Sequence, residues 1–182
     1  MADTGVKGRL DVWDKLSLML YRCGMILTGV ALLLLAAQQI FYPYWFKHSL
    51  VFLSLGALLQ AASLHIYKKS VRWILVTSCW IGVWLVGLSL ATSGLLAAYL
   101  SLGALFITLS GIAYKESLCF SLPYLKVIPL LLVLSWLAVF FAQAQWAAGG
   151  VLLTAFLYLY MAWRKINMPL FYDLGDRKKY EI

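Results

Sequence analysis

The chain has very little charge for its length. Only 12% of its 182 residues are Asp, Glu, Lys or Arg, whereas 64% are apolar and 15% are aromatic. A soluble domain of this size needs a polar surface that this composition cannot supply, so the classes of water-soluble enzyme and binding module are excluded. The composition predicts an integral membrane protein that is solvated by lipid.

Residues that hold metals and cofactors are also scarce. The chain has two histidines and three cysteines. His48 and His65 fall at opposite ends of one predicted helix, ~25 Å apart at 1.5 Å per residue, which is too far for both to ligate one haem. Cys23, Cys79 and Cys119 show neither metal-site nor disulfide spacing. We therefore predict no catalytic residue set, no cofactor and no metal.

Long runs without any charge locate the membrane. They cover residues 23–46, 48–67, 73–114 and 127–163. The first two have about the 20 residues that cross a bilayer, and the other two are about twice as long, so each longer run should form a hairpin. Small and polar residues break them at 92–94 and 143–146. The sequence predicts an all-α polytopic protein with six transmembrane helices in three tandem hairpins, at about 23–41, 48–67, 72–91, 95–114, 127–143 and 146–163.

Basic residues orient these helices. If both termini share one side of the membrane, that side holds 14 of the 15 lysines and arginines, and only Lys47 lies on the other side. The positive-inside rule then places both termini in the cytoplasm. Residues 1–22 form a cytoplasmic segment with an interfacial helix, 23–163 form the transmembrane domain, and 164–182 form a basic cytoplasmic tail. The expected location is the bacterial inner membrane, or a thylakoid membrane in a photosynthetic source.

The net charge of +8 could also indicate nucleic-acid binding. The basic residues are spread over four cytoplasmic segments and form no single groove, so we interpret them as facing anionic lipid headgroups and expect no nucleic-acid partner. The lipid bilayer itself is one partner. A second copy of the chain is another possible partner.

Two predicted helices resemble each other. "SLGALLQAASLHIYKKS" from Ser54 aligns with "SLGALFITLSGIAYKES" from Ser101, with nine identities in 17 positions that include the Tyr-Lys-x-Ser ends. This similarity indicates an internal duplication of a hairpin. Gln60 lies inside the first repeat, where it could hydrogen-bond across helices or bind a substrate near the midplane.

The segment "GIAYKESLCFSLPYLKVIP" is the candidate functional site. It brings Lys115, Glu116 and Cys119 together where the fourth helix should leave the membrane. A cysteine near an acid could act as a nucleophile with a base, but the segment offers no histidine or oxyanion glycines. The other interpretations are a loop that rests in the interface and a docking surface for a partner protein, formed by Tyr114, Lys115, Glu116, Cys119 and Phe120.

The same residues carry a resemblance. "YRCG", "GIAYKESLCF" and "LPYLKVIPLLL" resemble an uncharacterised family of integral membrane proteins of bacteria and plastids, defined as a domain of unknown function, over about residues 21–163. Its most specific element is the Tyr-Lys-Glu-x-x-Cys-Phe run. For photosynthetic members of such a family the resemblance implies a role in the biogenesis of membrane complexes, and it assigns no role to any residue. The chain departs from a pigment-binding expectation because no span holds an obvious chlorophyll-ligating histidine.

These observations leave three functional hypotheses. The first is a non-catalytic scaffold or assembly factor that docks a protein on the cytoplasmic side through its 114–126 loop and C-terminal tail. The second is a carrier or channel for a small neutral or lipidic solute, which six helices and Gln60 would permit. The third is a membrane enzyme that acts on lipid through Cys119 or nearby charges.

Overall fold

The computed structural model describes residues 11–41, 45–64, 68–92, 94–119 and 122–170. These residues form six α-helices and a short 3-10 helix. Their bounds are α1 Val12–Phe41, α2 Phe46–Ala62, α3 Lys69–Thr92, α4 Leu95–Cys119, η2 Pro123–Val127, α5 Ile128–Phe140 and α6 Ala144–Ile166. Five segments are long and apolar enough to cross a membrane, and α2 is a shorter apolar helix. The predicted all-α polytopic fold is confirmed.

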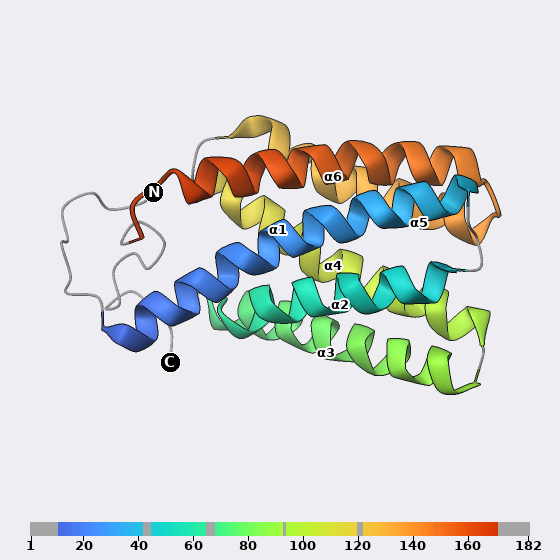
Figure 1. Ribbon diagram of the computed structural model, residues 1–182, viewed down its shortest axis with the longest axis horizontal. Coiled ribbons are helices and arrows are strands. Elements are labelled where there is room, and N and C mark those ends of the chain that lie inside the picture. The colour runs from blue at the N-terminus through green and yellow to red at the C-terminus, as the bar shows by residue number, and fades with distance from the viewer. Residues whose placement is uncertain (1–10, 42–44, 65–67, 93, 120–121, 171–182) are drawn as a thin grey trace.

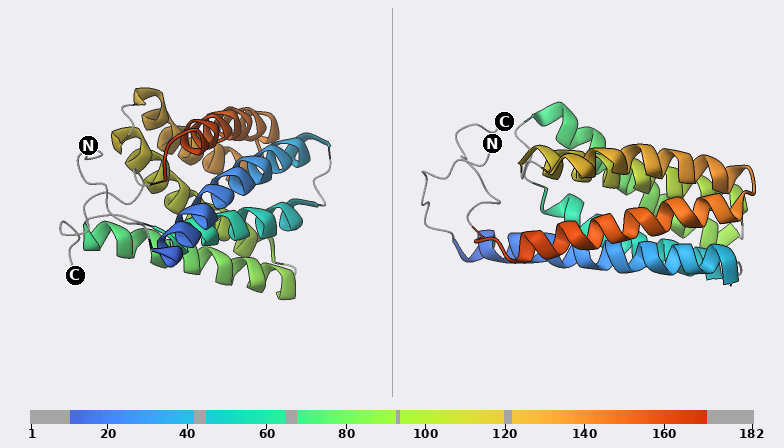
Figure 2. Two further views of the ribbon diagram at one scale, coloured as in Figure 1. Left: turned by 60° about the vertical axis from the view of Figure 1, so that its left-hand side comes forward. Right: turned by 90° about the horizontal axis from the view of Figure 1, so that it is seen from above.

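The helices run side by side as a bundle (Figure 1). Each of the three hairpins packs along its own length, α1 also lies against α6, and α4 contacts α2, α3 and α5. The beginning of α1 and the end of α6 lie at the same end of the bundle, as both views in Figure 2 show. We call this end, which also holds Lys69 and Cys119, the basic end. The opposite end, which holds Phe41 and Ala144, is the turn end.

The outer surface of the bundle is apolar. Each of the six α-helices exposes at least one large hydrophobic side chain in its middle turns, among them Ile26, Phe52, Trp84, Ile107, Val133 and Phe156. In water such an apolar surface would be prone to aggregation, whereas the hydrocarbon of a bilayer solvates it. The arrangement therefore fits a multi-pass protein surrounded by lipid.

Small residues let two of the helices approach closely. A Cβ atom built on Gly56 in α2 would lie 2.8 Å from the backbone nitrogen of Thr28 in α1, and one on Gly24 would lie 3.0 Å from the carbonyl oxygen of Gly56. The α1–α2 crossing therefore needs glycine on both sides, as membrane helix pairs often do. A Cβ atom built on Gly87 or Gly149 would meet no side chain or neighbouring helix within 4 Å, so these two glycines are not needed for a close helix contact.

Three helix ends differ from the sequence prediction by five residues or more. Helix α1 begins at Val12, so the expected interfacial helix is the first part of a long helix, and Leu18 in it is buried. Helix α2 ends at Ala62 and α4 continues to Cys119. Most of the expected 114–126 loop is thus helical, in α4 and η2. The membrane boundaries themselves stay a prediction.

Candidate functional site

Glu116 is buried at the basic end of the bundle. It lies in the last turns of α4, and its side chain has no exposed surface. The sequence placed it just beyond the fourth helix, in the 114–126 loop, but α4 extends to Cys119 and Glu116 lies inside the bundle, in contact with α1 and α6. A carboxylate removed from water must be compensated by nearby donors, because the cost of its desolvation is several kcal/mol.

Three side chains supply that compensation. Lys165 of α6 approaches Glu116 Oε1 at 2.7 Å and is itself only 2% exposed. Lys115 lies 3.2 Å from the same oxygen and is 18% exposed. The hydroxyl of Tyr21 in α1 donates a hydrogen bond to it at 2.7 Å. Charge-assisted hydrogen bonds of this length are the strong ones in proteins. We call Tyr21, Lys115, Glu116 and Lys165 the ion cluster.

The Tyr21 ring adds a second contact to both lysines. The ammonium of Lys165 lies 4.6 Å from the ring centroid, and that of Lys115 lies 5.3 Å from it. Both distances are within the range in which a cation is attracted to the face of an aromatic ring. Tyr21 therefore stabilises the cluster through its hydroxyl and through its ring, which explains why a tyrosine suits this buried position.

Glu116 Oε2 has a different environment. It is buried and has no hydrogen-bond partner within the described residues. The carboxylate thus presents one oxygen to three donors, while the other has no hydrogen-bond partner within the described residues. This asymmetry fits a group that holds α1, α4 and α6 together, since Tyr21, Lys115 and Lys165 all contact Oε1.

The other predicted site residues are scattered around the cluster. Tyr114 is 49% exposed, on the outward face of α4. Cys119 is partly buried near the end of α4. Phe120 lies outside the described residues. The structure thus brings Lys115 and Glu116 into one cluster but separates Tyr114 from it.

Gln60 contacts α1 across the helix crossing. Its amide nitrogen lies 2.6 Å from Thr28 Oγ1, to which it donates, and 3.2 Å from the carbonyl oxygen of Gly24. The side chain is fully buried. These contacts favour the helix-bridging interpretation of Gln60 over the substrate-binding one, and they reinforce the close α1–α2 crossing.

Sequence reasoning missed Tyr21 and Lys165 as partners of Glu116. Tyr21 is 95 residues away, and Lys165 was counted only among the basic residues of the cytoplasmic side. One signal was present: "YRCG" and "YKESLC" were both parts of the family resemblance, and the structure joins the two segments through Tyr21 and Glu116. Nothing in the local pattern around Lys165 distinguishes it from a headgroup-facing lysine.

The protein is by class a polytopic helical membrane protein. Its outer surface is apolar, its six α-helices pack together, and its ion cluster is buried at one end. The family described as "Uncharacterized integral membrane protein (DUF2301)" matches residues 59–181, more than half of the chain. The chain belongs to this family. The match covers all of the ion cluster except Tyr21, and it reaches further into the C-terminal tail than the resemblance of residues 21–163 suggested.

A full-length relative supports the same assignment. An "Uncharacterized protein" of Haemophilus influenzae (strain ATCC 51907 / DSM 11121 / KW20 / Rd) is 32% identical over 189 residues, with all of both chains covered. No solved structure matches this chain. The family description identifies an integral membrane protein and names no activity.

Proposed function

We propose that this protein is a non-catalytic scaffold or assembly factor for a complex in its membrane, and that it docks a partner protein at the basic end. The observation that carries the proposal is the division of α4 into two faces near its end. Glu116 is buried in the ion cluster, whereas Tyr114 and Leu118 are 49% and 54% exposed. Tyr114 and Leu118 are four residues apart and therefore share one face of the helix. We call these two residues the α4 docking face.

The charge of this end indicates the chemistry of the partner. Lys126 in η2 and Arg164 in α6 are exposed at the same end of the bundle. An apolar and aromatic pair near basic side chains suits a partner segment that carries hydrophobic anchors together with Asp or Glu. The tail from 164 onward stays part of the proposed surface, although residues 171–182 lie outside the described residues.

The membrane in which this docking would occur is the bacterial cytoplasmic membrane. The support is the excess of basic residues at one end and a relative from a bacterium. In a photosynthetic source the corresponding location would be the thylakoid membrane.

A photo-crosslinking experiment tests the docking proposal. A photoreactive amino acid placed at Leu118 in the full-length protein, irradiated in its own membrane, should give one discrete protein adduct. The crosslinked peptide should contain Asp or Glu beside apolar residues. Replacement of Tyr114 by alanine in the same chain should reduce the adduct several-fold, because the shared face loses its aromatic anchor.

Leu96 provides the matched control. It is an exposed leucine in the same helix at the turn end, so the same photoreactive amino acid there should not give this adduct. Only lipid adducts at Leu118, or the same adduct from both positions, would contradict docking. Substitution of Lys115 and Glu116 is unsuitable for this test, since Glu116 is buried in the ion cluster and its loss would disturb the bundle.

A further inference from the structure

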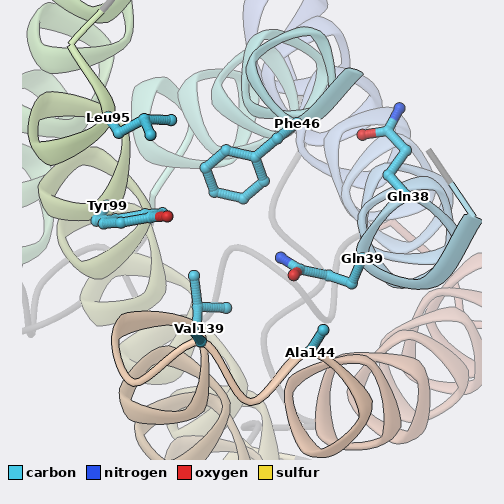
Figure 3. A pocket seen from close by; sticks show the side chains of 8 residues that line it. Gln38, Gln39, Phe46, Leu95, Tyr99, Val139 and Ala144 are labelled. Atoms are coloured by element: carbon cyan, nitrogen blue, oxygen red, sulfur yellow. The ribbon is translucent and has the colours of Figure 1, made fainter. Parts of the chain in front are cut away.

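The turn end contains a cavity that the docking proposal does not use. Its volume is about 380 Å³, and it is lined by residues from the ends of α1, α2, α4, α5 and α6. These residues are Gln38, Gln39, Phe46, Leu95, Tyr99, Val139, Ala142 and Ala144. Figure 3 shows their side chains arranged around a common space. The volume is within the range of pockets that bind small molecules.

One polar group of this cavity has unused hydrogen-bonding capacity. The amide nitrogen of Gln39 is buried and has no hydrogen-bond partner within the described residues. The Gln39 side chain extends into the cavity, and the hydroxyl of Tyr99 points into it from the opposite side (Figure 3). A buried N–H without a partner is costly to folding, so its retention needs an explanation. A ligand oxygen that accepts from Gln39 would provide one.

The neighbouring glutamine has another role. Gln38 Oε1 accepts a hydrogen bond from the hydroxyl of Ser49, which links α1 to α2 beside the cavity. Gln38 Oε1 is therefore engaged with α2, whereas the Gln39 amide nitrogen has no partner within the described residues. The two side chains point in different directions (Figure 3).

Tyr99 is held firmly in position. Its backbone carbonyl accepts the indole N–H of Trp136 at 2.8 Å. Its ring packs edge-on against Phe46 and Phe140, with centroids 5.9 and 6.3 Å apart. A ring fixed from α2 and α5 keeps its hydroxyl directed into the cavity, so a ligand would meet a preformed donor.

The lining defines the class of ligand. Among the lining residues that the structure describes none is charged, so an ion would lose its hydration without receiving a counter-charge. Phe46, Leu95 and Val139 supply an apolar wall. At roughly 30 Å³ for each water-sized unit, the space holds on the order of ten non-hydrogen atoms.

We propose that this cavity binds a small neutral compound with an apolar body and an oxygen that accepts hydrogen bonds from the Gln39 amide and the Tyr99 hydroxyl. The cavity lies at the turn end, which the distribution of basic residues assigns to the non-cytoplasmic side. The ligand would therefore arrive from that side. The site is independent of the α4 docking face, since it lies at the other end of the bundle.

Binding of acetophenone tests the proposal. Acetophenone is neutral and has a carbonyl acceptor on an aromatic body. Its titration into the full-length protein in detergent, followed by saturation-transfer NMR, should give saturable binding. Benzoate and benzylammonium carry the same ring with a negative or a positive charge, and each should bind at least tenfold more weakly.

Two substitutions distinguish the site from partition into the micelle. Gln39→Leu removes the unpartnered amide and should weaken acetophenone binding at least tenfold, while the protein stays folded. Tyr99→Phe keeps the ring and removes only the hydroxyl, and should weaken binding several-fold. Gln143→Leu, an exposed residue of the same end, is the matched control and should bind as the wild type does.

Three results would overturn the proposal. The first is the absence of saturable acetophenone binding, which would mean that the cavity holds only water. The second is equal binding of the charged analogues, and the third is unchanged affinity in the folded Gln39→Leu variant. None of these outcomes depends on the crosslinking result at Leu118.

Discussion

The contact between Lys165 and Glu116 joins two residues that are nearly inaccessible to solvent. Loss of one partner from such a pair leaves a buried charge that other groups must neutralise, at a cost of about 3–5 kcal/mol. Loss of both partners removes that penalty. Removal of one partner from this pair should therefore cost more stability than removal of one partner from an exposed ion pair, which contributes ~0–1 kcal/mol.

We predict that Lys165→Met and Glu116→Gln each lower the thermal unfolding temperature of the detergent-solubilised protein markedly. The double variant should lose clearly less than the sum of the two single losses, because neither Glu116 nor Lys165 then stays buried as a charge without the other. Thermal denaturation of the four proteins measures this coupling. Lys126→Met, at an exposed lysine of the same end, should have little effect. Strictly additive losses would show that the pair is not energetically coupled.

At the scale of helices, the α1–α2 crossing depends on the absence of a side chain at Gly56. A methyl group there would lie 2.8 Å from a backbone atom of Thr28, and backbone cannot move aside as the end of a flexible side chain can. The Gln60 contacts with Thr28 and Gly24 would be displaced together with the crossing.

We predict that Gly56→Ala destabilises the protein by about 1–3 kcal/mol, the usual cost of overpacking. The measurement is thermal unfolding in the same detergent. Gly87→Ala in α3 is the matched control, since the added Cβ atom would meet no side chain or neighbouring helix within 4 Å, and it should leave stability unchanged or slightly higher because alanine favours a helix. Equal behaviour of the two variants would contradict the close crossing.

Much of this helical arrangement could be predicted from the sequence, because charge-free runs and their breaks reflect the thickness of the bilayer directly. The breaks near Thr92 and Gln143 correspond to the turn between α3 and α4 and the turn between α5 and α6. The end of α2 at Ala62 could not be predicted, because the charge-free run continues to Tyr67 without a glycine or proline that would end a helix.

The candidate site was less predictable than the helices. Lys115 and Glu116 were both predicted as site residues, but neither their pairing nor the burial of Glu116 was predicted, since both depend on how α1 and α6 pack against the end of α4. Such burial is a tertiary property with no local pattern. The unpartnered amide of Gln39 was also beyond sequence reasoning, because it follows from the positions of five helix ends around one cavity.

At the scale of the whole molecule, the two ends of the bundle have different chemistry. The basic end holds the ion cluster and the α4 docking face, whereas the turn end holds the uncharged cavity. Lys47 is the exception in charge, and its ammonium donates to the carbonyl oxygen of Ser89 at 2.8 Å. A lysine that neutralises a helix C-terminus in this way serves local packing, so it does not oppose the orientation set by the other basic residues.

That orientation can be measured with single cysteines. In a background without the three native cysteines, Ala91→Cys probes the turn end and Lys126→Cys probes the basic end; both positions are exposed. A membrane-impermeant maleimide added to intact bacterial spheroplasts should label Cys at 91 and not at 126, and inverted vesicles should reverse the pattern. The reason is the cost of moving a basic end across the membrane against the positive-inside bias. Labelling at 126 in spheroplasts would place the ion cluster and the α4 docking face outside, and the cavity would then open to the cytoplasm.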